Sequence, residues 1–153
     1  MQWLEHKIPP PIVGALVGLA MWLAAPVGPM LAVDLTARFA AVAGLVVIGL
    51  AFDLLGLLAF RASRTTVNPL TPQRATALVT AGVYRITRNP MYVGLFFLLL
   101  AWAIYLSAPL ALAGPVVYVL YVTRFQIIPE ERVLHVLFGE QYATYSASVR
   151  RWM

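Results

Sequence analysis

The sequence predicts an all-α integral membrane protein with a single domain, residues 1–153, built from about four membrane-spanning helices and a C-terminal interfacial amphipathic helix. Two properties of the composition predict this class. The mean hydropathy is +0.82, and 11% of the residues are charged, whereas soluble domains carry about 25% charged residues. The third observation is that apolar residues form long segments, which leave no stretch large enough for a second core.

Four apolar segments approach the ~20 residues that a helix needs to cross a bilayer. They cover residues 12–33, 39–60, 91–107 and 110–128. Pro26 and Pro29 are expected to break the last turn of the first segment. Because only Ala108 and Pro109 separate the third and fourth segments, these two should form a tight helical hairpin. We expect no cleaved signal peptide, since the first apolar run is long enough to span and further spans follow it.

The positive charges predict how the helices are oriented. In a four-span arrangement, Arg38 falls on one side of the membrane and the other basic residues fall on the opposite side. These residues are Lys7, Arg61, Arg64, Arg74, Arg85, Arg88, Arg124, Arg132, Arg150 and Arg151. Because Lys and Arg near the span ends are retained in the cytoplasm, both termini and residues 61–89 should be cytoplasmic, in a bacterial or archaeal membrane. Topology and attraction to anionic lipid account for the basic charge, so nucleic-acid binding has no support.

The segment after Pro129 is amphipathic. Its apolar residues recur at helical spacing, with polar residues between them. They are Val133, Leu134, Leu137, Phe138, Tyr142 and Tyr145. We expect Gly139 to end or kink this helix. The segment could lie on the cytoplasmic interface, anchored by Trp152, or fold back over the preceding loop as a lid.

The composition also excludes several kinds of chemistry. The chain has no cysteine, so disulfides, thiolate ligands and cysteine nucleophiles are excluded. The two histidines, His6 and His135, are far apart in the sequence, and we expect no zinc or other metal site.

Polar chemistry is concentrated at two points that flank the apolar hairpin. The first is the run LVTAGVYRITRNPMYVG at residues 78–94, and the second is Pro129-Glu130-Glu131. Ionisable groups beside a membrane are costly unless they have a partner or a task. Because the hairpin brings the start of the third span beside the end of the fourth, the two clusters should converge. The pattern therefore predicts a site.

Each element of these clusters also has a structural interpretation. Arg88 could be a topology determinant or a ligand contact. Asn89 and Pro90 could be an ordinary N-cap and first helical residue, or could leave backbone N–H groups that receive a carboxylate. Glu130 and Glu131 could complement the helix dipole, or bind a ribose or a cationic group.

Asp53 lies about two turns inside the second span, where an unpaired carboxylate would cost several kcal/mol. It needs a partner, and Arg124 is the leading candidate. A buried pair of this kind is as often architectural as catalytic.

The arrangement GVYRITRNPMYVG, then an apolar hairpin, then PEERVLHVLFGEQYATYSASVRRW resembles the isoprenylcysteine carboxyl methyltransferase and phospholipid N-methyltransferase group of small membrane enzymes. The hallmark of that group is Arg-His-Pro-x-Tyr-x-Gly followed by a Glu-Glu pair. The resemblance covers roughly residues 53–152. Asn89 stands where the better-known members have His, and an amide cannot shuttle a proton near neutral pH. The Gly-x-Gly of the phospholipid enzymes is absent from Tyr92-Val93-Gly94.

The resemblance implies a site for S-adenosylmethionine between the last two spans, the cytoplasmic loop and the C-terminal helix. It implies cosubstrate contacts from Tyr84, Arg88, Asn89, Pro90, Tyr92, Gly94, Glu130 and Glu131. Arg88, Arg124 and Glu131 are the expected catalytic residues, and either arginine could position an acceptor carboxylate.

The function expected is therefore an S-adenosylmethionine-dependent membrane methyltransferase acting on a lipophilic acceptor. An isoprenylcysteine-type carboxylate is favoured over a phospholipid amine. The competing class is a non-enzymatic four-helix transporter or assembly subunit that uses Asp53 and Arg124 as an ion pair. A transporter should show internal repeats or midplane charges in both halves, and the sequence shows neither.

Overall fold

The computed structural model describes residues 5, 7–63 and 76–153, and its regular elements are all helices within these ranges. They are α1 (Pro10–Ala24), α2 (Leu35–Ala62), α3 (Pro90–Leu106), α4 (Ala113–Val122) and α5 (Ile128–Ser148). Single helical turns at Ala25–Val27, Gly82–Arg85 and Pro109–Leu112 connect them. The all-α prediction is confirmed.

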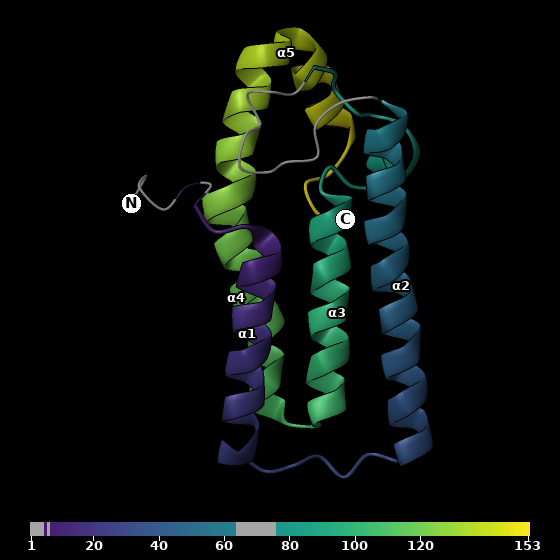
Figure 1. Ribbon diagram of the computed structural model, residues 1–153, viewed down its shortest axis with the longest axis vertical. Helices are drawn as coiled ribbons and strands as arrows, with labels where there is room; N and C mark the ends of the chain where they lie inside the picture. The colour runs from purple at the N-terminus through teal and green to yellow at the C-terminus, as the bar shows by residue number, and fades with distance from the viewer. Residues whose placement is uncertain (1–4, 6, 64–75) are drawn as a thin grey trace.

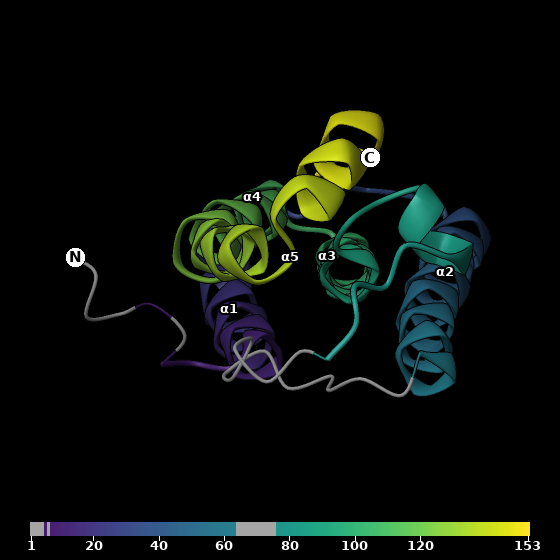
Figure 2. The same ribbon diagram turned by 90° about the horizontal axis from the view of Figure 1, so that it is seen from above.

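The helices form an antiparallel bundle, in which α4 continues into α5 along nearly the full height of the molecule (Figure 1). Seen from above, α3 lies between α2 on one side and α1 with α4 on the other (Figure 2). Three helical stretches are long and apolar enough to cross a membrane, namely Pro10–Val27, Leu35–Ala62 and Pro109–Ser148. The apolar helix α3 is shorter, with 17 residues, or about 25 Å. The protein is an integral membrane protein.

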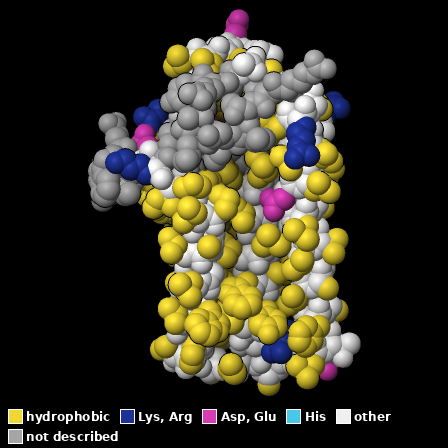
Figure 3. Space-filling view, viewed as in Figure 1, with side chains coloured by type: hydrophobic (Ala, Val, Ile, Leu, Met, Phe, Trp, Pro, Cys, Tyr) yellow, Lys and Arg dark blue, Asp and Glu magenta, His cyan; other side chains and the backbone are white. Residues whose placement is uncertain are grey.

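The surface agrees with a lipid environment. Figure 3 shows apolar side chains along the helices and basic side chains mostly towards the ends of the molecule. Large side chains such as Leu16, Trp22, Val47 and Leu54 are more than half exposed. A contiguous apolar surface of this kind is covered by lipid in a membrane protein.

Glycines set the contact between α2 and α3. A Cβ added to Gly94 would lie 2.7 Å from the carbonyl oxygen of Gly49 and would collide with the carboxylate of Asp53. A Cβ added to Gly49 would lie 2.9 Å from the carbonyl oxygen of Gly94. The two backbones can therefore approach this closely only because both positions lack a side chain.

The sequence predicted that the fourth span ends near residue 128 and that an amphipathic helix follows. The structure starts α5 at Ile128, but no break separates the two helices, because a π-helical turn, Thr123–Ile127, joins α4 to α5. A wider turn of this kind accommodates Pro129, which cannot donate a backbone hydrogen bond. The direction changes instead at Gly139, with φ 49° and ψ −121°, so the predicted kink is confirmed. The chain then folds back towards the start of α3 (Figure 1).

Candidate active site

A cavity of about 400 Å³ lies where α2, α3 and α5 meet the segment that precedes α3. Its volume falls in the range of roughly 300–1,000 Å³ that is typical of small-molecule sites. Its polar and aromatic lining comprises Asp53, Phe60, Tyr84, Arg88, Asn89, Tyr92, Glu130, Glu131, Tyr142 and Tyr145. Leu57, Met91, Leu95, Ile127 and Leu134 are among the apolar residues that complete the wall.

The two polar clusters of the sequence converge on this cavity. The hydroxyl of Tyr92, in the first turn of α3, donates to the carboxylate of Glu130, in the first turn of α5, at 3.2 Å. Pro90 and Gly94, two expected cosubstrate contacts, are buried outside the lining. They shape the first turns of α3 and its packing against α2.

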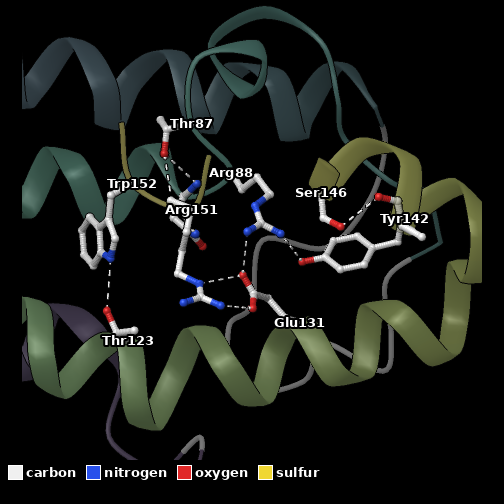
Figure 4. A network of polar contacts seen from close by, with 10 residues as sticks. Thr87, Arg88, Thr123, Glu131, Tyr142, Ser146, Arg151 and Trp152 are labelled. Atoms are coloured by element: carbon white, nitrogen blue, oxygen red, sulfur yellow. Dashed lines mark hydrogen bonds and ion pairs between the residues drawn. The ribbon is translucent and has the colours of Figure 1, made fainter. Parts of the chain in front are cut away.

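Glu131 is the centre of a charged network (Figure 4). Arg151 donates to both of its carboxylate oxygens, from Nε at 2.9 Å and from Nη2 at 2.7 Å. Arg88 approaches one of the same oxygens with Nη2 at 3.3 Å, and its Nη1 donates to the hydroxyl of Tyr142 at 3.3 Å. Two guanidinium groups thus share one carboxylate, and the network carries a net positive charge.

The pKa values in this network follow from its contacts. Hydrogen bonds to Glu131 raise the pKa of Arg151. A phenol is neutral at physiological pH, so the hydroxyl of Tyr142 accepts from Arg88 without compensating its charge.

The Nε–H donor of Arg88 has no hydrogen-bond partner among the described residues. This Nε is buried, and the whole side chain is 14% exposed. A buried donor without a partner is costly. An anionic ligand in the cavity could satisfy it.

The C-terminal segment lies beside the cavity, and its residues 149–152 are called the C-terminal clasp below. The backbone N–H of Arg88 donates to the carbonyl of Arg150 at 3.0 Å. The hydroxyl of Thr87 and the side-chain amide of Asn89 both donate to the carbonyl of Arg151, at 3.2 and 2.9 Å. The indole of Trp152 donates to Thr123 at 3.1 Å. Three consecutive residues before α3 therefore hold the clasp.

Asn89 occupies the N-cap position of α3 and Pro90 its first helical residue, but the Asn89 side chain makes no capping hydrogen bond. It donates to the clasp instead, although the residue lines the cavity. Sequence reasoning missed Thr87 and Arg151. The only signal for Arg151 was its position beside Trp152 at the end of the resembling region.

Two tyrosines link the folded-back part of α5 to the cavity wall. Tyr84 is buried and packs edge-on against Phe60, with ring centroids 5.4 Å apart. The hydroxyl of Tyr145 donates to the carbonyl of Tyr84 at 2.7 Å. After Gly139, α5 therefore folds back over the segment before α3, which is one of the two positions that the sequence left open for the C-terminal helix.

The expected pair between Asp53 and Arg124 is wrong. Arg124 pairs with Glu5 at 3.2 Å, and its side chain is 49% exposed. It does not line the cavity, whereas Asp53 does. The reason is the helix order, since α3 lies between α2 and α4 and separates the two residues. No ion pair or hydrogen bond to Asp53 is present within residues 5, 7–63 and 76–153.

Comparison with known proteins identifies the family. An uncharacterized protein of Haemophilus influenzae is 41% identical over 63 residues, which are 41% of this chain and the whole of that protein. The sequence model of the phospholipid methyltransferase family matches residues 37–141, more than half of the chain. The matched range includes the first turns of α3 and α5 and all of the residues between them. The chain belongs to the phospholipid methyltransferase family.

Proposed function

We propose that this protein transfers a methyl group from S-adenosylmethionine to the head group of a lipophilic acceptor. The observation that carries the proposal is the cavity itself, which combines polar groups of the membrane boundary with apolar walls from α2 and α3. Family membership supports the reaction type.

The residues present fit the cosubstrate. The unpartnered Nε of Arg88 suits the carboxylate of the methionine part. The oxygens of Glu130 suit ribose hydroxyls, and the rings of Tyr84 and Tyr92 suit a sulfonium through cation-π contacts. When bound, S-adenosylmethionine supplies an electrophilic methyl group. The protein has to align the acceptor with it and exclude water.

The charges of the cavity favour an amine acceptor. Within the described part of the chain, Arg88 is the cationic side chain that lines the cavity. If it binds the methionine carboxylate, no described cation remains for an acceptor carboxylate. Asp53, by contrast, is a carboxylate without a cationic partner in that part of the chain, and it can hold an ammonium group. The amine is thus preferred over the carboxylate that the sequence favoured.

A second feature supports a lipid as the acceptor. A groove of about 500 Å³ runs between α1 and α3, lined by Gly14, Gly18, Leu98, Trp102 and further apolar residues. Leu95 lines both this groove and the cavity. A hydrocarbon chain in the groove would leave its head group at the cavity. The arginine distribution further supports a site that faces the cytoplasm.

The test uses the purified protein in detergent, membrane lipid extract and S-adenosylmethionine labelled in its methyl group. We expect label in the organic phase that mild alkali does not release as volatile methanol, because an N-methyl bond is stable where a methyl ester releases methanol. Label released as volatile methanol would establish the carboxylate acceptor instead. Absence of labelled lipid together with absence of S-adenosylhomocysteine binding would refute the proposal.

The variant Asp53→Asn tests the acceptor assignment. It removes the charge that would hold an ammonium group and keeps the shape of the side chain. We expect at least a tenfold loss of methyl transfer, in line with ~1.4 kcal/mol, while S-adenosylhomocysteine affinity stays within about twofold. Arg132→Met is the matched control, because Arg132 pairs with Glu5 and does not line the cavity.

A further inference from the structure

Arg151 and Arg88 compete for the same carboxylate. Arg151 places two donors on the two oxygens of Glu131, at 2.9 and 2.7 Å. Arg88 contacts Glu131 with a single nitrogen at 3.3 Å. The planar fork of a guanidinium matches both oxygens of a carboxylate, and Arg151 occupies that position. Figure 4 shows Glu131 between the two guanidinium groups.

The position of Arg151 decides what remains free on Arg88. If both oxygens of Glu131 were available, Arg88 would be drawn into the same two-point pairing, since it already touches one of them. Such pairing would use a second nitrogen of Arg88. With Arg151 in place, Nε of Arg88 is left without a partner in the part of the chain that the structure describes, and its Nη1 contacts the neutral hydroxyl of Tyr142.

The backbone of Arg151 is fixed independently of its side chain. Its carbonyl accepts from Thr87 and Asn89, and the neighbouring carbonyl of Arg150 accepts from the N–H of Arg88. Trp152 anchors the other end of the clasp on the helix that leads to Glu131. The segment that carries Arg88 therefore also holds the residue that competes with it.

We infer that Arg151 is a positioning residue, which keeps the guanidinium of Arg88 available for the carboxylate of the cosubstrate by occupying both oxygens of Glu131. This inference rests on the proposed function. It gives the C-terminal clasp a role in cosubstrate selectivity, and it makes Asn89 one of the residues that hold the clasp in position.

The inference predicts a loss that is specific for the ligand carboxylate. Calorimetric titration compares S-adenosylhomocysteine with 5′-methylthioadenosine, which has the same nucleoside and thioether but no amino-acid carboxylate. In Arg151→Met we expect S-adenosylhomocysteine to bind about tenfold more weakly. This loss is near the lower end of the free-energy range for a hydrogen bond to a charged group. The affinity for 5′-methylthioadenosine should stay within about twofold, because that ligand does not use Arg88.

The matched control is Arg132→Met. It removes the same charge from an exposed side chain that pairs with Glu5 and does not line the cavity. Both ligands should bind as they do to the unmodified protein. Equal losses in Arg132→Met and Arg151→Met would overturn the inference in favour of a general charge effect.

A double-mutant cycle tests whether Arg151 acts through Glu131. In Glu131→Gln the side chain is a neutral amide, which does not form the charged two-point pair with Arg88. Adding Arg151→Met to this variant should therefore cause no further loss of S-adenosylhomocysteine affinity, because nothing draws Arg88 away. Independent, additive losses would contradict the inference. If Arg151→Met does not fold, Arg151→Lys keeps the charge without the fork and should still weaken S-adenosylhomocysteine selectively.

The outcomes separate the two proposals. An unmodified protein that binds neither ligand would refute the proposed function. If the unmodified protein binds both ligands, the proposed function stays in place. The inference about Arg151 would then be refuted by equal losses for both ligands in Arg151→Met, or by unchanged selectivity in Arg151→Lys. In either case the clasp would be a structural element only.

Discussion

Replacing Gly94 by alanine tests the contact on which the cavity wall depends. The added methyl group would lie 2.7 Å from the carbonyl oxygen of Gly49 and would collide with the carboxylate of Asp53. The carbonyl of Gly49 belongs to the backbone of α2, which cannot move away without opening the seam between α2 and α3. Overpacking of this kind costs roughly 1–3 kcal/mol, while alanine gains up to about 1 kcal/mol over glycine within a helix.

The net expectation is a loss of about 1–2 kcal/mol in the free energy of unfolding. Gly44→Ala is the matched control, because Gly44 lies in α2 and an added Cβ meets nothing within 4 Å. It should leave stability unchanged or raise it by up to about 1 kcal/mol. Unfolding by denaturant in detergent measures both variants. If Gly94→Ala is as stable as Gly44→Ala, the close approach of α2 and α3 is wrong.

Three further predictions concern the site and the topology. Glu131→Ala and Tyr92→Ala should each weaken S-adenosylhomocysteine binding at least tenfold, ~1.4 kcal/mol. The reason is that the single contact of Glu131 orients Arg88 and the hydroxyl of Tyr92 holds Glu130. Circular dichroism should show the fold retained, and wild-type affinity in both variants would contradict the site. Arg124→Ala should leave the S-adenosylhomocysteine affinity within about twofold, because Arg124 pairs with Glu5 at the surface and such pairs contribute ~0–1 kcal/mol. A tenfold loss would show that Arg124 belongs to the site. In sealed vesicles, cysteines replacing Thr80 and Leu110 should react with impermeant reagent from opposite sides, and reaction from the same side would refute the orientation.

The convergence of the two polar clusters could be predicted because it depends on local features. Hydropathy locates the spans within a window of about 20 residues, and a two-residue connection between the last two spans forces their distant ends together. Tyr92 and Glu130 meet as this reasoning requires. Their roles in binding and catalysis stay predictions, as does the orientation in the membrane.

The partners of the charged residues could not be predicted in the same way. Asp53 and Arg124 were matched by depth and charge alone, but α3 lies between their helices. The bond between Asn89 and the carbonyl of Arg151 joins residues 62 positions apart, and no periodicity in the sequence indicates it. Pro129 lies in the first turn of α5, but the π-helical turn that joins α5 to α4 has no sequence signature of its own.

The sequence by itself determined the helical membrane class, the four apolar segments, the kink at Gly139 and the meeting of the two polar clusters. Each of these follows from interactions within one segment or across one short turn. Only the tertiary structure decided that Arg151 shares Glu131 with Arg88 and that Gly94 packs against Asp53. The physical reason is that pairing and packing depend on which helix lies beside which, and hydropathy, which is similar on all of the spanning helices, does not specify their order.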